Sequence, residues 1–146
     1  MSERQRLRVE VPRGAFVKRD EHGVAELWSP LPCPFAYGSV IGTQAEDGDA
    51  LDAVLLGGAP PAGAEVEGRL VGRVPFVDDG VQDDKLVFWI GAGPGPGRRQ
   101  RALVAAFFFA YALAKGARAA LRGSRASTRT ARPRWRAEAP PLPVDR

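Results

Sequence analysis

Three aspartates, Asp47, Asp49 and Asp52, stand within six residues of one another. In an extended segment side chains alternate, so Asp47 and Asp49 would project from one face. Gly48 allows the backbone to bend, which would bring Asp52 to the same place. Carboxylates held this close repel one another unless a cation lies between them, and Mg²⁺ or Mn²⁺ is the suitable hard cation. The alternative for so short a pattern is a solvated acidic turn.

A second acidic cluster occupies residues 78–84, with Lys85 directly after it. Taken alone, it is consistent with a polar hairpin loop between two strands. If Asp78, Asp83 and Lys85 face the first cluster, the result is a site with several carboxylates, several metal ions and a nearby cation. Such a site suits phosphoryl chemistry, because paired metal ions clamp phosphate oxygens and activate water.

Short apolar segments rich in β-branched and aromatic residues must position these acids. They lie at residues 7–11, 39–41, 53–56, 69–74 and 85–90. Clusters of Gly, Pro and Asp separate them, which predicts a small barrel or a strongly bent sheet. A Gly- and Pro-rich hinge at residues 91–97 precedes one helix. We expect that helix to begin near Arg98 and either to end near Lys115, with Gly116 as its C-terminal cap, or to continue through residues 117–121.

Composition indicates a soluble globular chain. It has 146 residues, of which 45% are hydrophobic and 26% charged, enough for one domain with a core. Cys33 is the single cysteine, which excludes an intrachain disulfide, and the polar start shows no signal peptide. The apolar run at residues 102–114 is shorter than the roughly 20 residues of a membrane span. A cytoplasmic protein without a membrane partner is therefore expected.

The net charge of +4 is unevenly distributed. Residues 117–146 hold eight Arg and two acidic residues, a net charge of +6, so the rest of the chain carries −2. We therefore expect a folded domain at residues 1–116 and a mostly disordered Arg/Ala/Pro-rich tail at residues 117–146. Such a tail could bind nucleic acid, whereas the acidic clusters favour a small anion met through metal ions.

Five segments, in order, resemble motifs of the family I (soluble) inorganic pyrophosphatases. Residues 47–52 resemble the family's Asp-Gly-Asp-Pro-x-Asp, residues 9–14 its Ile-Glu-Ile-Pro-x-Gly, and residues 36–38 its Asn-Tyr-Gly. Residues 71–85 are similar to its Val-Gly-x-Leu…Asp-Glu-x-Gly-x-Asp-x-Lys, and residues 107–116 to the helix with its last substrate tyrosine. The resemblance implies an α+β, mainly β fold, a five-stranded, partly open OB-like barrel with a C-terminal helix packed against it.

The resemblance also implies a reaction, the Mg²⁺-dependent hydrolysis of pyrophosphate to two phosphates, with Mn²⁺ as an alternative metal. It assigns Asp49 as the base that accepts a proton from metal-activated water. The implied phosphate-binding residues are Lys18, Tyr37, Lys85 and Tyr111. The implied metal ligands are Asp47, Asp52, Asp78 and Asp83. Glu10 and Asp20 would belong to the outer part of the site, with Asp20 shorter than the family's Glu. A homo-oligomer is a further expectation.

Two phosphate-binding cations of the family pattern have no counterpart. Residues 25–32 contain no Arg or Lys, and Ala112 stands where the family has a lysine after its substrate tyrosine. Candidate replacements are Arg19, Arg98, Arg99 and Arg101. The alternative function is a catalytically impaired metal- or phosphate-binding relative, and a more distant one is a nucleic-acid binder acting through the tail.

Overall fold

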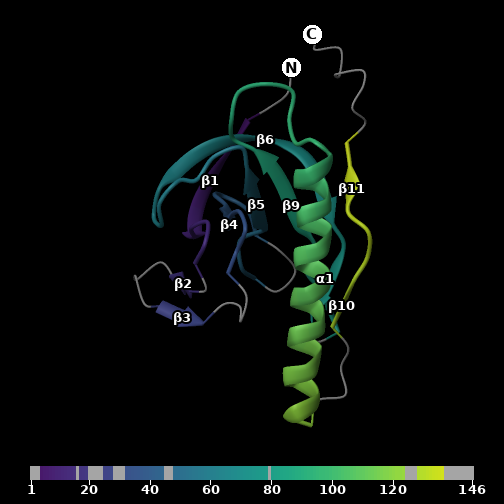
Figure 1. Cartoon of the computed structure of the whole chain (residues 1–146). Helices are drawn as coiled ribbons and strands as arrows, with labels where there is room; N and C mark the ends of the chain where they lie inside the picture. Colours follow the sequence, from purple (N-terminus) through teal and green to yellow (C-terminus); the bar gives the residue numbers. More distant parts are fainter. Residues whose placement is uncertain are drawn as a thin grey trace.

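The computed structural model describes residues 4–15, 17–19, 25–27, 32–44, 48–78, 80–123 and 128–136. Its centre is a ring of five strands (Figure 1). In ring order they are β1 (Arg4–Val11), β4 (Ala36–Val40), β5 (Asp52–Leu56), β9 (Lys85–Trp89) and β6 (Glu65–Val74). Pairing of β1 with β6 closes the ring, and β9 enters between β5, to which it is parallel, and β6. The predicted five-stranded, OB-like barrel is confirmed, and it is closed.

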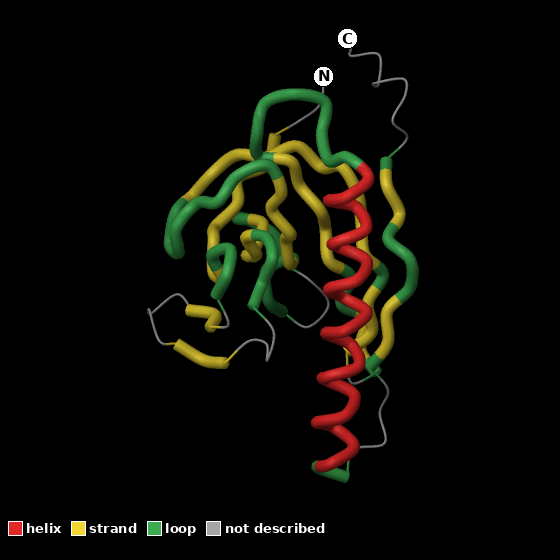
Figure 2. The backbone as a smooth tube through the Cα atoms, viewed as in Figure 1, coloured by secondary structure: helices red, strands yellow, loops and turns green. Residues whose placement is uncertain are grey.

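One helix, α1 (Arg98–Leu121), runs along the outside of the barrel and extends past it at its C-terminal end (Figures 1 and 2). The other strands are short. They are β2 (Val17–Arg19), β3 (Ala25–Leu27), β7 (Phe76–Asp78), β8 (Val81–Gln82), β10 (Arg129–Thr130) and β11 (Arg134–Trp135). The β2–β3 hairpin forms a separate small sheet, while β7, β8 and β10 form another and β11 pairs with β6.

Alternation along the strands gives the barrel two faces with different partners. The inner core fills the ring with side chains that are at most 2% exposed: Leu7, Val9, Ala36, Val40, Ala53, Leu55 and Phe88. The helix-facing core lies on the outer face, where Tyr37, Val54 and Val87 pack with residues of α1. The outer face therefore has a helix-covered apolar layer that can hold polar groups at its edge.

Helix α1 buries one side against this outer face. Its buried residues are Val104, Phe107, Phe108, Tyr111 and Ala112, whose spacing of three and four places them on one stripe. The opposite side leaves Phe109 and Leu113 more than half exposed. By length and composition alone α1 could cross a membrane, but core helices share that character. The prediction of a helix buried against the domain is confirmed for the described stripe.

The end of α1 differs from the predicted cap at Gly116 and agrees with the alternative, an extension through residues 117–121. The helix continues through Gly116 to Leu121, and the positive φ of +80° belongs to Gly123 instead. A helix-interior glycine costs about 1 kcal/mol, and the Ala- and Arg-rich residues 117–120 are strong helix formers that offset it.

The tail also differs from the predicted disorder within residues 128–136. There, β10 pairs with β7 and β11 pairs with β6, both antiparallel. Trp135 packs against the helix-facing core, in a place that Gly72 leaves free, since a Cβ at Gly72 would lie 2.7 Å from the Trp135 ring. Two free strand edges and one aromatic anchor order this segment despite its arginines, so these residues are an ordered exception within a tail expected to be mostly disordered.

Candidate active site

The barrel register brings a lysine and two aspartates together on the outer face. Ala53 pairs with Leu86 in the parallel β5–β9 ladder, so the preceding residues Asp52 and Lys85 are neighbours where the two strands begin. Lys85 Nζ donates to Asp52 Oδ2 at 2.8 Å and to Asp83 Oδ2 at 2.7 Å. The Lys85 side chain is 5% exposed, whereas those of its two partners are about one-fifth exposed. We call Asp52, Asp83 and Lys85 the inner triad.

The buried ammonium of Lys85 remains charged. Burial lowers its pKa, but the charges and hydrogen bonds of Asp52 and Asp83 raise it, and the net direction is upward. Aromatic rings complete the surroundings, with Nζ 4.9 Å from the Phe76 ring centroid and 5.9 Å from that of Tyr37. These contacts are within the range of cation–π attraction. The inner triad is therefore a fixed positive charge held between two carboxylates.

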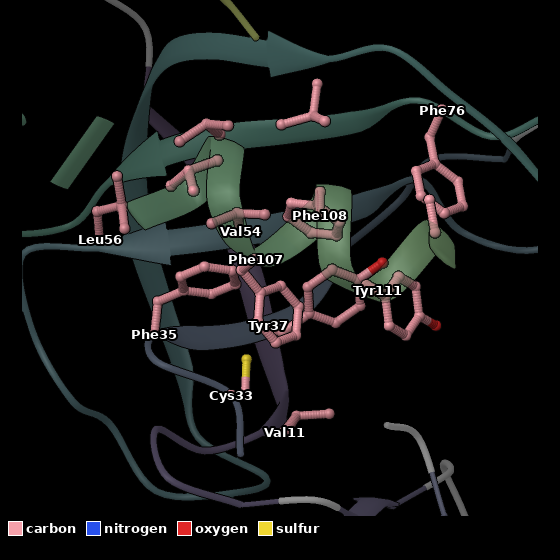
Figure 3. Close-up of a cluster of buried hydrophobic side chains, with 14 residues drawn as sticks. Val11, Cys33, Phe35, Tyr37, Val54, Leu56, Phe76, Phe107, Phe108 and Tyr111 are labelled. Carbon is pink, nitrogen blue, oxygen red and sulfur yellow. The ribbon is translucent and has the colours of Figure 1, made fainter. Parts of the chain in front are cut away.

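Two tyrosines border the inner triad from different elements. Tyr37 comes from β4 and Tyr111 from α1, and both lie with Phe76 at one end of the helix-facing core (Figure 3). Burial raises the pKa of Tyr37 well above its usual value, and the charge of Asp52 adds to this. Burial likewise raises the pKa of Tyr111. Both hydroxyl groups keep their protons at neutral pH and can donate hydrogen bonds to an anion.

The inner triad holds two carboxylates and one ammonium, and the pKa of Asp83 departs from its usual value. Burial raises its pKa from 3.8 to about 6, a rise that Lys85 opposes and Asp52 reinforces. Two carboxylates that share one lysine would be stabilised in their ionised form by a further cation. Their oxygen donors suit Mg²⁺ or Mn²⁺. Within the described residues no group of three or more His, Cys, Asp or Glu is placed to hold a metal. The donor chemistry fits the metal, and the third carboxylate implied by the resemblance, Asp47, lies outside those residues.

Asp78 is held separately, at the end of β7 in the β7–β8 hairpin. Lys115 Nζ of α1 donates to Asp78 Oδ2, and Thr128 Oγ1 lies 3.4 Å from Asp78 Oδ1. The Lys115 side chain is 33% exposed. We call Asp78 and Lys115 the rim pair. The charges of both the rim aspartate and the inner triad act on Tyr111, and Lys115 Nζ lies 5.3 Å from the Tyr111 ring centroid.

The acidic cluster at residues 78–84 is thus divided between several tasks. Residues 76–78 and 81–82 form the hairpin that the sequence allowed as an alternative to a site. Asp84 fixes it, because Asp84 Oδ1 accepts hydrogen bonds from the Phe76 backbone N–H and from Gln82 Nε2. The Asp83 backbone N–H closes the hairpin by donating a hydrogen bond to the Phe76 carbonyl oxygen, while the Asp83 carboxylate belongs to the inner triad. The hairpin and the site are therefore the same structure.

Glu10 lies on β1, which β4 separates from Asp52 on β5. Ser39 Oγ donates to Glu10 Oε2 at 3.0 Å, and Ser39 is the register partner of Asp52. Tyr37 and Ser39 are two residues apart on β4, so their side chains share a face. Gly38 between them is indispensable, because a Cβ there would lie 1.7 Å from the carbonyl oxygen of Arg8. The serine is a polar neighbour that the motif comparison did not single out.

Asp49 stands in the loop that leads into β5 and is exposed. The positive φ of +92° at Gly48 gives this loop the bend that the sequence predicted. Thr43 Oγ1 fixes the loop by donating to the Val40 carbonyl and accepting from the Leu51 N–H. The other predicted site groups, namely Asp47, Asp20 and the side chain of Lys18, lie outside the part of the chain that the structure describes. Their roles stay predictions.

The proposed replacement cations of α1 lie at the wrong end of the helix. Arg101 stacks its guanidinium 4.9 Å from the Trp135 ring centroid, and Arg98 and Arg99 precede it by less than one turn. Ten residues separate Arg101 from Tyr111, about 15 Å along a helix. The cation that α1 does bring to the site is Lys115, which the sequence analysis missed as a candidate. Its spacing of four residues from Tyr111 was the available signal.

Comparison with known proteins identifies the family. The family model described as inorganic pyrophosphatase matches residues 7–91, more than half of the chain. An inorganic pyrophosphatase of Gluconobacter oxydans is 34% identical over 87 residues, which cover 54% of this chain and 50% of that protein. An inorganic pyrophosphatase of Neisseria meningitidis serogroup A is 47% identical over 55 residues, which cover 37% of this chain and 31% of that protein.

The fold agrees with these matches. The crystal structure of inorganic pyrophosphatase from Thermus thermophilus superposes with a TM-score of 0.72 and 25% identity, covering 92% of this chain and 83% of that one. In sequence, the chain spans about half the length of the first curated relatives it matches. With motifs, barrel and family model in agreement, the chain belongs to the inorganic pyrophosphatase family.

Proposed function

We propose that this protein hydrolyses inorganic pyrophosphate to two phosphates and that it uses Mg²⁺. The observation that carries the proposal is the inner triad, a buried lysine between two carboxylates, bordered by two protonated tyrosines. That set provides hydrogen-bond donors for phosphate oxygens and carboxylates for a hard cation. Family membership supports the same substrate.

Lys85, Tyr37 and Tyr111 would bind the phosphate groups. The charged Lys85 ammonium and the two hydroxyl groups donate hydrogen bonds to oxygens whose negative charge grows as the leaving phosphate departs. The packing of Phe76 and Phe108 around them limits their rotamers, so little side-chain entropy is lost on binding. Lys18 is assigned to the same role by the resemblance.

Asp49 would act as the general base. Its carboxylate takes a proton from the attacking water as the water oxygen bonds to phosphorus and the bridging P–O bond breaks, and the leaving phosphate keeps the electron pair. Mg²⁺ would be held by Asp47, Asp52, Asp78 and Asp83, where it would acidify water and offset negative charge. Asp49 suits the role because it lies in an exposed loop three residues before Asp52, outside the inner triad.

Phosphate release from pyrophosphate tests the proposal. Wild type is measured with Mg²⁺ and with EDTA, next to Asp49→Asn and Glu67→Gln. Glu67 is an exposed acid on β6 and provides the matched control for loss of one surface carboxylate. We expect Mg²⁺-dependent activity that falls by about 10²-fold or more in Asp49→Asn and is unchanged in Glu67→Gln.

Equal phosphate release by wild type and Asp49→Asn would falsify hydrolysis with Asp49 as base. If neither protein releases phosphate above the level in EDTA, the chain is the impaired metal- or phosphate-binding relative, in line with the missing arginine and the alanine at position 112. Calorimetric titration with Mn²⁺ and inorganic phosphate would identify that case, since binding would persist without turnover.

The remaining expectations complete the proposal. The catalytic unit is the segment of residues 1–116, to which the ordered residues 128–136 add strands. Glu10 and Asp20 form its outer part. A cytoplasmic homo-oligomer remains the expected form, and the exposed Phe109 and Leu113 give α1 an apolar side for self-association. Nucleic acid stays a minor alternative linked to the basic tail.

A further inference from the structure

The rim pair contains a cation that no assigned role uses. Lys115 follows Tyr111 by four residues on α1, so the two side chains share a helix face. Its Nζ donates to Asp78 Oδ2 and lies 5.3 Å from the Tyr111 ring centroid. Lys115 therefore lies beside both a proposed metal ligand, Asp78, and a proposed hydrogen-bond donor to phosphate, Tyr111.

The two lysines of the site are held with different firmness. Lys85 is 5% exposed and is fixed by two carboxylates, whereas Lys115 is 33% exposed and its ion pair is with Asp78. An ion pair at that exposure contributes little stability, so its partner can be exchanged at small cost. Lysine carries three donors on a flexible stem, which allows the ammonium to turn to a new acceptor nearby.

Charge explains when such an exchange would occur. The described acids Asp52, Asp78 and Asp83 outnumber the lysines Lys85 and Lys115, so the site as described would repel a polyanion. A divalent cation bound at Asp78 would compete with Lys115 for the carboxylate oxygens of Asp78. The Lys115 ammonium would then lie beside Tyr111 with N–H groups available to donate hydrogen bonds to a phosphate oxygen bound there.

We propose that Lys115 is a substrate-binding cation, which pairs with Asp78 in the empty site and turns to a phosphate oxygen once a divalent cation binds that aspartate. This rests on the proposed function. It supplies one of the two cations that the chain lacks from its family pattern, from a position one helical turn beyond Ala112. It also gives the rim pair a function that its small stabilising effect does not explain.

The test uses the full chain and three variants, Lys115→Met, Lys115→Arg and Arg118→Met. Arg118 is exposed on the same helix and is the matched control for loss of one cation. Calorimetry measures the affinity for Mn²⁺ alone and then for inorganic phosphate in saturating Mn²⁺. Steady-state kinetics with pyrophosphate gives KM and kcat, and thermal unfolding checks that each variant is folded.

For Lys115→Met we expect phosphate affinity to fall by about tenfold or more and KM to rise. Mn²⁺ affinity should stay the same or increase, because Asp78 has lost its competitor. Lys115→Arg should keep most of the phosphate affinity, and Arg118→Met should match wild type in both titrations.

Two outcomes would overturn the proposal for Lys115. Wild-type phosphate affinity in Lys115→Met would exclude contact with substrate, and parallel loss of Mn²⁺ and phosphate affinity would indicate that Lys115 only positions Asp78. Failure of the proposed function is a separate result. If no variant hydrolyses pyrophosphate but Lys115→Met still loses phosphate affinity, the hydrolysis proposal fails and Lys115 remains a phosphate-binding residue.

Discussion

The inner and outer faces of the barrel are built from the same strands and are both largely apolar, but among the described residues only the outer face carries charged groups at its edge. On the inner face, β4, β5 and β9 contribute Ala36, Leu55 and Phe88, all within the closed apolar ring. On the outer face the same strands contribute Tyr37, Asp52 and Lys85. The inner face excludes charge because the closed ring offers a buried ion no partner and no water.

The difference separates stability from chemistry. Each inner side chain contributes by filling volume, so its removal leaves a cavity. The outer charges contribute by balancing one another, so removing one is costly whereas removing all of them together is cheap. Changes on the inner face should therefore lower stability without changing the chemistry. Changes to the charged groups of the outer face should alter the chemistry without lowering stability, except where they leave a charge unpaired.

The largest expected effect is that of Lys85→Met. We expect unfolding free energy to fall by about 3–5 kcal/mol, because Asp52 and Asp83 would be left together without their cation. Activity should fall by about 10²-fold or more. Urea unfolding in EDTA measures the first effect, and phosphate release in Mg²⁺ the second. The triple variant Asp52→Asn, Asp83→Asn, Lys85→Met should recover most of the stability and none of the activity. A triple variant as unstable as Lys85→Met would contradict the charge-balance account.

The inner face is tested by Leu55→Ala. Leu55 is fully buried, so the cavity should cost about 3 kcal/mol of unfolding free energy. Below the unfolding transition, KM and kcat for pyrophosphate should match wild type. Val81→Ala, at a site 47% exposed, is the control and should change stability by about 0.5 kcal/mol or less. A large change in KM for Leu55→Ala would show that the two faces are coupled.

A smaller effect comes from the titration of Asp83 in metal-free protein. Burial raises its pKa from 3.8 to about 6. Between these values the folded protein holds a proton that the unfolded chain has lost. The contribution of Asp83 to the unfolding free energy should therefore be largest below about pH 4 and fall as the pH rises toward 6. The difference between wild type and Asp83→Asn, from urea unfolding in EDTA across this range, isolates that contribution. A difference that stays flat or rises with pH would contradict it.

The smallest expected effect concerns the helix-facing core next to the site. Cys33 is fully buried there, and burial raises the pKa of its thiol to about 12. The native protein should therefore not react with a disulfide reagent at about pH 8, and the protein unfolded in guanidinium chloride should react with one thiol per chain. Fast reaction of the native protein would mean that this apolar layer opens readily, unlike the inner core.

Several parts of this arrangement were predictable from short-range patterns. Alternation in residues 7–11 and 53–56 predicted strands, and the positions of Tyr37, Asp52 and Lys85 followed from motifs with fixed spacing. These signals are local, because the alternation of side chains along a strand and the spacing of residues within a motif are both contained in a short segment. For that reason Asp52, Asp83 and Lys85 could each be named as site residues from the resemblance, although their pairing with one another was not predicted.

The rest depends on contacts between distant segments. Lys115 reaches Asp78 across 37 residues, through the length and direction of α1. The pairing of β11 with β6 depends on a strand edge left free and on the space over Gly72. Neither the ion pair of Lys115 nor the pairing of β11 can be predicted from the composition of its own segment. An arginine-rich stretch therefore looked disordered although part of it has a place to pair.

The place of β9 has a consequence for the order of events in time. Among the five ring strands β9 comes last in the chain, yet it lies between β5 and β6. In a chain still emerging from the ribosome, β5 and β6 each lack β9 as a neighbour until residues 85–89 have been synthesised, so the ring stays incomplete until then. Since Lys85 opens that strand, the same docking event closes the ring and brings the ammonium to Asp52. Docking of β9 thus completes the ring and assembles the inner triad in a single step.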